Sequence, residues 1–432
     1  MLATTLAACE TKVQAPVQPV QVPPVTEPPR PLPPPTADVE VEPAPPSGPV
    51  PPMQEGVRVA FLAPLSGPNA ALGRALLDAA QLAVFEVGDD QLVLLPRDTR
   101  GTPEGAAAAA ESVIAAGARL IVGPLFAADV PAVAARARPA GVSVLSFSND
   151  LSVAGPGVFV MGVPPRAQID RVISFARSRG LSRYAGLLPN NSYGAAVESA
   201  LRAATERVGG QLTVIERYDP ATTDASPVVR RLASYEARRA NLQQQRRELE
   251  GREDEASKQA LRRLEGIDTL GEVRFDSLVL PDFGDRLLSI APLLPYYDID
   301  PNRIRLLGTS LWDDMRVTRE PALIGGWFAA PPPEAREPFN KRYREVYRRE
   351  PPRLATIAYD ATALAAVLAR NEGGPDFSIE AITNPVGFAG MDGVFRLLPD
   401  GSIERALAVM EVQRARFRTI SPAPETFEEQ TQ

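Results

Sequence analysis

Few side chains of this 432-residue chain could carry out a chemical step, because it contains no histidine and one cysteine. Histidine is the usual general base and proton shuttle and the commonest metal ligand. Its absence excludes Ser/His/Asp and Cys/His mechanisms, and a single cysteine excludes an intrachain disulfide and a cysteine-rich zinc site. The carboxylate pair Asp313 and Asp314 remains, but adjacent side chains usually point apart and one pocket rarely receives both. We therefore expect no enzyme, no metal and no cofactor.

The single cysteine, Cys9, ends the apolar stretch MLATTLAAC. Small residues precede it, as at a processing site, and the stretch resembles the lipobox of bacterial lipoproteins. In that family the cysteine is lipidated and becomes the first residue of the mature chain. No Lys or Arg precedes this stretch, which is short for a signal, and a start codon farther upstream would explain both. We interpret residues 1–9 as a remnant lipoprotein signal with Cys9 as the lipidation site; a chance Ala-rich terminus is the alternative.

A proline-rich segment follows, because residues 10–53 hold 16 of the 45 prolines of the chain. Proline fixes φ and removes an amide donor, and this segment has no periodic apolar pattern. We expect residues 10–56 to form a disordered, semi-rigid tether. The alternative is that its PPxxP-like stretches bind another domain.

The charge of the chain argues against a nucleic-acid partner. The formal net charge is -7, and the arginines are interleaved with Asp and Glu rather than clustered. Phosphate binding relies on a clustered basic face. We expect no nucleic acid, and contact with a membrane through a lipid anchor only.

From residue 57 onward, short apolar runs alternate with helical stretches, which indicates βαβ units and parallel sheets. The predicted fold class is α/β, with two Rossmann-like lobes joined by multiple hinge crossings. We expect the first lobe over 57–163 with 311–392 returning to it, the second over 164–310 with 393–417 returning to it, and a disordered tail over 418–432. The last part should hold an antiparallel hairpin that turns at Pro399-Asp400-Gly401.

This pattern resembles the leucine-binding branch of the type I periplasmic binding proteins over about 57–417. The resemblance is carried by AFLAPLSGPNAALGRALLDAAQLA (60–83), IVGPLF (121–126), VLSFSND (144–150), LPNNSYGAAV (187–197) and the late motif Phe388, Gly390, Gly393 and Phe395 in the spacing F-x-G-x-x-G-x-F. The resemblance implies a ligand between the lobes, at the carboxyl ends of the strands, as is general for open α/β sheets.

The matching positions give the candidate ligand-binding residues Ser66, Phe126, Ser146, Ser148, Asn149, Tyr193, Trp312 and Asp313. Some positions depart from the amino-acid-binding pattern, because Phe126 and Ala127 replace an expected hydroxyl residue and Leu72 replaces an aromatic residue. Asp313 is the candidate carboxylate for a ligand ammonium. The alternatives are that the two cleft serines only make turn hydrogen bonds and that Tyr193 only opens its helix.

A strongly charged insertion spans residues 225–267, where the connection between two strands would need only a single short helix. It should form a long helix or a helical hairpin, with pairs Glu248–Arg252 and Asp254–Lys258 at i,i+4. Its thin apolar seam indicates limited packing on the lobe. The insertion is either a solvated protrusion or a docking surface, for which the candidates are Arg238, Arg246, Arg247, Glu250 and Arg252.

The insertion, the lipobox and the tether together resemble the penicillin-binding protein activators, as does the stretch FDSLVLPDFGDRLLSIAPLLPYYDID (275–300). These outer-membrane lipoproteins stimulate a peptidoglycan synthase. The resemblance implies a non-catalytic periplasmic protein anchored to the outer membrane, with a penicillin-binding protein as partner. The alternative is the solute-binding receptor of an ABC importer, which takes a branched-chain or other amino acid or an amide. The large helical-repeat domain of the enteric activators has no counterpart in this sequence.

Overall fold

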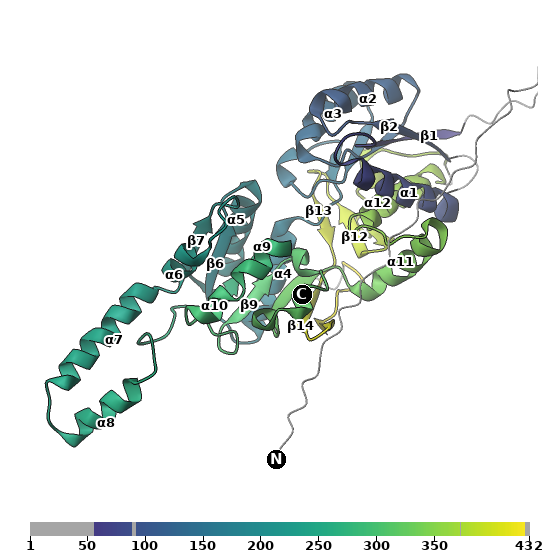
Figure 1. Ribbon diagram of the computed structural model, residues 1–432. Helices are drawn as coiled ribbons and strands as arrows, with labels where there is room; N and C mark the ends of the chain where they lie inside the picture. Colours follow the sequence, from purple (N-terminus) through teal and green to yellow (C-terminus); the bar gives the residue numbers. More distant parts are fainter. Residues whose placement is uncertain (1–55, 89–91, 372, 428–432) are drawn as a thin grey trace, which may run out of the picture. The chain divides into compact units, whose positions relative to one another are not determined.

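The computed structural model describes residues 56–88, 92–371 and 373–427 (Figure 1). The predicted lipidation site Cys9, and the predicted tether except its last residue, lie outside the described residues. The predicted tail 418–432 is wrong at its start, because residues up to Ser421 belong to a strand that pairs with its neighbour over Val409–Gln413.

The first lobe is a parallel sheet of five strands in the order β2-β1-β3-β4-β5. Its strands are β1 (Val57–Ala63), β2 (Leu92–Asp98), β3 (Leu120–Val122), β4 (Ser143–Ser146) and β5 (Val158–Val160). Both faces are covered, as a parallel sheet requires. Val59 and Phe61 pack with helices α1 (Ala70–Val87), α11 (Pro333–Tyr347) and α12 (Ala355–Ala369), whereas Ala60 and Leu62 pack with α2 (Pro103–Ala115) and α3 (Val130–Ala137).

The second lobe is a sheet of seven strands in the order β15-β14-β10-β9-β8-β6-β7. Its strands are β6 (Arg183–Pro189), β7 (Gln211–Tyr218), β8 (Ser277–Val279), β9 (Arg305–Gly308), β10 (Trp327–Ala330), β14 (Ala408–Gln413) and β15 (Arg416–Ser421). One face packs on α4 (Pro165–Ser178) and α5 (Ser192–Arg207), and the other on α6 (Ser226–Leu232), α9 (Gly284–Ile290) and α10 (Leu293–Tyr296). The predicted fold class, two α/β lobes with parallel sheets, is confirmed.

The chain passes between the lobes three times, after β5, after β10 and before β14. The predicted return of 311–392 to the first lobe is wrong for β10, which pairs with β9 and β14 in the second sheet. The apolar sequence of β10 fits the core of either lobe, so only its strand pairing decides to which lobe it belongs. Residues from α11 onward do pack on the first lobe.

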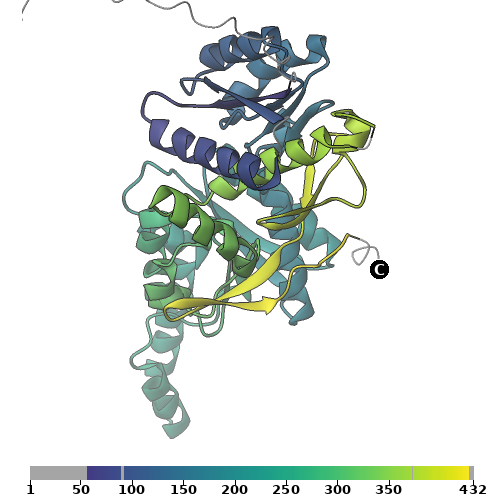
Figure 2. The same cartoon turned by 90° about the vertical axis from the view of Figure 1, so that its right-hand side faces the viewer.

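The predicted return of 393–417 to the second lobe is wrong for its first part. Strands β11 (Phe388–Gly390), β12 (Gly393–Leu397) and β13 (Ile403–Arg405) form a separate antiparallel sheet. Phe395, Leu397 and Ile403 are buried in the core of the first lobe. The hairpin that turns at Pro399-Asp400-Gly401 joins β12 to β13, as the turn residues predict, and Figure 2 shows this sheet in yellow beside α12.

The insertion forms a helical hairpin of α7 (Tyr235–Glu250) and α8 (Glu255–Leu264), which lie side by side beyond the helices that cover the second sheet (Figures 1 and 2). The two predicted i,i+4 ion pairs are not formed, because α7 ends before Arg252 and Asp254 caps α8. Asp254 Oδ1 accepts the backbone N–H of Ser257 at 2.9 Å, and Lys258 Nζ instead lies 3.1 Å from Glu255 Oε1.

Candidate functional site

In both lobes, a glycine near the start of a helix lets that helix pass close to the end of the preceding strand. A Cβ at Gly73 would lie 1.9 Å from Pro64 O, and a Cβ at Gly194 would lie 1.8 Å from Pro189 O. Glycine is therefore required where α1 and α5 pass their preceding strands. The Asn191 side chain also caps α5 by accepting the Gly194 N–H at 2.9 Å.

A carboxylate that the sequence analysis missed, Asp98 at the end of β2, fixes the loop after β1. Its Oδ1 accepts backbone N–H groups from Leu65 at 2.8 Å, Ser66 at 3.3 Å and Arg100 at 2.8 Å. Burial alone would raise the pKa of Asp98, but the hydrogen bonds from Ser66, Arg100 and Leu65 lower it below its ordinary value. Ser66 itself is exposed at this edge.

Ser146, which ends β4, and Ser148, which follows it, have their hydrogen-bond partners within the first lobe. Ser146 Oγ donates to Pro124 O at 3.2 Å and accepts the Ser148 N–H at 3.2 Å, and Ser148 Oγ accepts the Asp150 N–H at 3.0 Å. Both serines are buried. This is the turn hydrogen bonding that was the alternative interpretation of these residues.

Two other predicted residues of the first lobe differ in burial. Phe126 is half-buried and packs against the core beside Gly101, where an added Cβ would lie 3.3 Å from its ring. Asn149 is exposed. Ser66, Phe126 and Asn149 therefore present an apolar ring and two polar groups at the ends of β1, β3 and β4.

In the second lobe, Tyr193 lies in the first turn of α5 and its hydroxyl is 3.0 Å from Thr309 Oγ1, after β9. Burial raises the pKa of Tyr193 to about 12, so the phenol is neutral at physiological pH. Tyr193 therefore both opens its helix and reaches the end of another strand.

A second tyrosine joins this edge beside a carboxylate that the sequence analysis missed. The hydroxyl of Tyr218, at the end of β7, donates to Asp282 Oδ2, and Asp282 Oδ1 accepts the Phe283 N–H at 2.8 Å. Burial and the hydrogen bond to Asp282 raise the pKa of Tyr218, and burial raises the pKa of Asp282. The available signal was position, because Asp282 follows β8 and parallel strands end at one edge.

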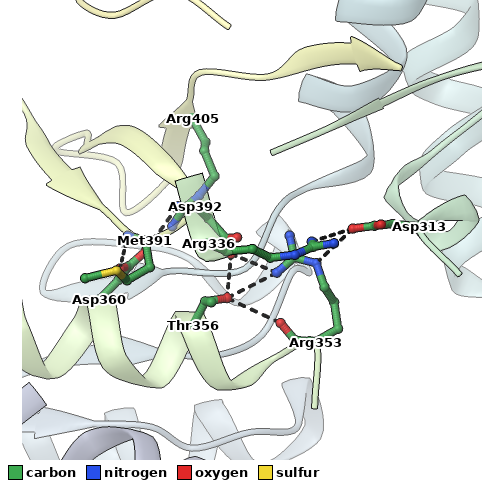
Figure 3. Close-up of polar contacts among 8 residues, drawn as sticks. All are labelled: Asp313, Arg336, Arg353, Thr356, Asp360, Met391, Asp392 and Arg405. Atoms are coloured by element: carbon green, nitrogen blue, oxygen red, sulfur yellow. Dashed lines mark hydrogen bonds and ion pairs between the residues drawn. The ribbon is translucent and has the colours of Figure 1, made fainter. Parts of the chain in front are cut away.

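Two predicted ligand-binding residues are engaged elsewhere. Trp312 is fully buried in the second core, and its Nε1 donates to Leu280 O at 3.0 Å, so it cannot line a ligand site. The Asp313 carboxylate is paired with Arg336 and lies 3.4 Å from Arg353 Nε (Figure 3). It is therefore not a free carboxylate for a ligand ammonium.

The predicted docking residues of the hairpin fall into two groups. Arg238 Nη2 donates to Gly271 O at 2.7 Å, and Arg246 Nη2 donates to Ile267 O at 3.2 Å, so these two hold the segment that follows α8 to α7. Arg247, Glu250 and Arg252 are exposed.

A cavity of about 1010 Å³ lies away from the predicted cleft residues, none of which lines it. It is lined by Arg166, Asp170 and Arg171 of α4 and by residues around β13. Arg171 donates to Leu407 O at 2.8 Å and to Ser421 Oγ at 2.7 Å. Its guanidinium therefore holds α4 to the chain where it crosses between the lobes before β14.

Within the described ranges, no group of three or more His, Cys, Asp or Glu side chains is placed to hold a metal ion. None of the helices in the part of the chain that the structure describes combines the length and hydrophobicity of a membrane span.

A family model described as periplasmic binding protein matches residues 56–416. An uncharacterized protein of Rickettsia prowazekii is 21% identical over 182 residues, an alignment that covers 42% of this chain and 48% of that protein. The chain thus spans about half the length of this curated relative.

Solved structures show the same fold at low identity. A putative branched-chain amino acid ABC transporter from Rhodospirillum rubrum has a TM-score of 0.66 and 18% identity, over 84% of this chain and 100% of that one. A branched-chain amino acid ABC transporter ligand-binding protein from Burkholderia xenovorans has a TM-score of 0.64 and 15% identity, over 85% of this chain and 96% of that one. A branched-chain amino acid transporter substrate-binding protein from Streptococcus pneumoniae, in complex with isoleucine, has a TM-score of 0.57 and 19% identity, over 85% of this chain and 100% of that one.

Proposed function

This chain belongs to the periplasmic binding protein family, and on that premise we propose that it is a solute-binding receptor that holds a small organic ligand between its two lobes. A periplasmic location follows from the family. The proposal includes no catalytic step, and it makes the protein the receptor component of an ABC importer.

One observation carries the proposal: in each lobe, polar groups lie where the parallel strands end. The first lobe supplies exposed Ser66 and Asn149 on loops fixed by Asp98 and by the turn hydrogen bonds of the serines. The second lobe supplies the hydroxyl of Tyr193, which is oriented by the buried Thr309. Ligands of open α/β sheets bind at this edge.

The residues favour a ligand with an apolar part and few charges. Ser146 and Ser148 are occupied by their own turns, and the Asp313 carboxylate is occupied by arginines. Half-buried Phe126 offers an apolar contact, and the neutral phenol of Tyr193 offers a hydrogen bond. We propose an amino acid or amide with an apolar side chain, contacted by Ser66, Phe126, Asn149 and Tyr193.

Isothermal titration calorimetry against a panel of amino acids and amides tests this function. Saturable binding with micromolar or tighter affinity is expected for at least one apolar member, together with a rise in melting temperature, because a ligand that binds only the folded state stabilises it. Tyr193→Phe should weaken binding by about tenfold for a lost hydrogen bond of ~1.4 kcal/mol. Absence of binding across the panel would remove the proposal.

A second candidate function is that of an outer-membrane lipoprotein, anchored through Cys9, that binds and activates a peptidoglycan synthase of the penicillin-binding protein class. The helical hairpin favours it, because Arg238 and Arg246 brace the hairpin while Arg247, Glu250 and Arg252 stay exposed. A braced, solvated projection suits docking to another protein.

Deletion of residues 236–265 separates the two functions. A receptor should keep its ligand affinity without the hairpin, whereas an activator should lose co-purification with the synthase and stimulation of transpeptidation. The triple variant Arg247→Ala, Glu250→Ala, Arg252→Ala is the milder companion, because it leaves the two bracing arginines in place. Undiminished stimulation after the deletion would exclude the hairpin as the docking surface.

A further inference from the structure

The glycine motif around β11 and β12 makes room for a buried carboxylate. A Cβ at Gly390 would lie 2.5 Å from Asp360 Oδ2, so glycine is needed where β11 passes α12. The Met391 N–H donates to Asp360 Oδ1 at 2.7 Å, and Arg405 Nη1 donates to Asp360 Oδ2 at 3.3 Å. The Arg405 guanidinium lies 4.8 Å from the ring centroid of Phe395. The motif thus shapes the site of a buried ion pair.

Arg353 extends this polar network from the start of α12. Its Nη1 donates to Asp392 Oδ2 at 2.9 Å and to Thr356 Oγ1 at 3.1 Å, while Thr356 Oγ1 lies 2.6 Å from the same carboxylate oxygen. Burial alone would raise the pKa of Asp392, but Arg353 and Arg405 lower it below its ordinary value. Asp392 is therefore ionised, and it holds Arg353 to the first lobe.

The same arginine reaches the second lobe. Arg353 Nε lies 3.4 Å from Asp313 Oδ2, and Arg336 Nη1 donates to that oxygen as well (Figure 3). Asp313 follows Trp312, which is fixed in the second core, whereas Arg336 belongs to α11, which packs on the first core. The side chains of Asp313 and Arg336 are only 5% and 16% exposed.

We infer that Asp313 is a latch, that is, a contact that holds the two lobes together. Its contact with Arg336 and Arg353 fixes the angle between the lobes and so positions the ligand-binding edges without touching the ligand. The inference rests on the proposed function in one respect, namely that a ligand is bound between the lobes. Removing one partner of a mostly buried ion pair leaves the other unpaired. Without the Asp313 carboxylate, Arg336 is expected to gain hydration by movement of one lobe against the other.

Distance measurement between the lobes tests the latch without any ligand. Spin labels are placed at Ala108→Cys on α2 and Ser199→Cys on α5, both exposed positions, in a chain that carries Cys9→Ser. The parent should give one narrow distance distribution by pulsed electron paramagnetic resonance. Asp313→Asn should shift it or add a second population, and Asp313→Glu should restore the parent distribution at least in part.

The neighbouring carboxylate supplies the matched control. Asp314 Oδ2 lies 2.7 Å from Arg316 Nη2 within the second lobe, so Asp314→Asn should leave the distribution unchanged. Arg336→Gln removes the partner of Asp313 in the other lobe and should reproduce the effect of Asp313→Asn. It therefore tests the latch even if the Asp313→Asn variant does not fold.

Unchanged distances in both Asp313→Asn and Arg336→Gln would overturn the latch, as would an equal change in Asp314→Asn. Failure of the proposed function is a separate result, because it is measured by the ligand panel. If a ligand is found, Asp313→Asn should change its affinity while the contacts of Tyr193 stay intact, so a further Tyr193→Phe change should have its usual effect.

Discussion

Replacing Asp129 by asparagine is expected to stabilise the protein at neutral pH. Asp129 precedes α3 and is only 1% exposed, and neither of its carboxylate oxygens has a hydrogen-bond partner. Burial, with a smaller effect of Glu104, raises its pKa from 3.8 to about 6. A shift of roughly two pKa units corresponds to about 3 kcal/mol between the charged and the neutral form.

The sign follows from the direction of that shift. The folded state binds the proton of Asp129 more tightly than the unfolded state, so this group favours folding below about pH 3.8 and loses that contribution as the pH rises through about 6. The asparagine side chain that replaces it is neutral throughout, but its amide is also buried, and the start of α3 already favours an anion. We therefore expect a gain of about 1–3 kcal/mol at pH 7.5 and little change at pH 4.5.

Urea unfolding followed by circular dichroism at both pH values measures this difference. Asp285→Asn is the matched control, because the Asp285 side chain is 96% exposed and the change should stay within about 0.5 kcal/mol. Glu104→Gln should stabilise in the same direction by a smaller amount. An Asp129→Asn variant that is no more stable at pH 7.5, or equally stabilised at both pH values, would refute the reasoning.

Three further variants test other parts of the structure. Trp312→Ala should destabilise by about 3–5 kcal/mol, since it opens a cavity in the second core, and a loss below about 1 kcal/mol in urea unfolding would contradict its burial. Tyr193→Phe should cost about 1 kcal/mol because Thr309 loses its hydroxyl partner, measured against Tyr296→Phe, whose residue is 72% exposed. Gly390→Ala should lower the melting temperature by several degrees, because its Cβ would lie 2.5 Å from Asp360 Oδ2, whereas Gly373→Ala, with no atom within 4 Å, should not.

Local sequence predicted much of the fold because each signal depends on near neighbours. Apolar runs such as VRVAFLA became buried strands whose alternate residues face different helix layers. The charged insertion became helical because its residues favour helices, and the break between its two helices falls at Gly251. The i,i+4 pair Glu248–Arg252 failed because helix spacing does not continue past Gly251, and the pair Asp254–Lys258 failed because Asp254 caps α8.

The assignment of late segments to lobes could not be obtained in this way. β10 has an apolar sequence that fits either core, and its place in the second sheet rests on pairing with β9 and β14. The missed carboxylate Asp98 ends β2 and the missed carboxylate Asp282 follows β8, and their importance depends on which strand ends become neighbours.

The sequence by itself determined which side chains are available for chemistry and where they could lie. A chain without histidine has few routes to catalysis, and the strand ends mark Ser66, Tyr193 and Asp313 as candidates. Only the tertiary structure decided their roles. Trp312 and Asp313 are adjacent, yet one fills a core and the other meets Arg336, 23 residues away, and Arg353 of the other lobe. Such outcomes depend on burial and on partners brought together by folding, neither of which is encoded in the spacing of nearby residues.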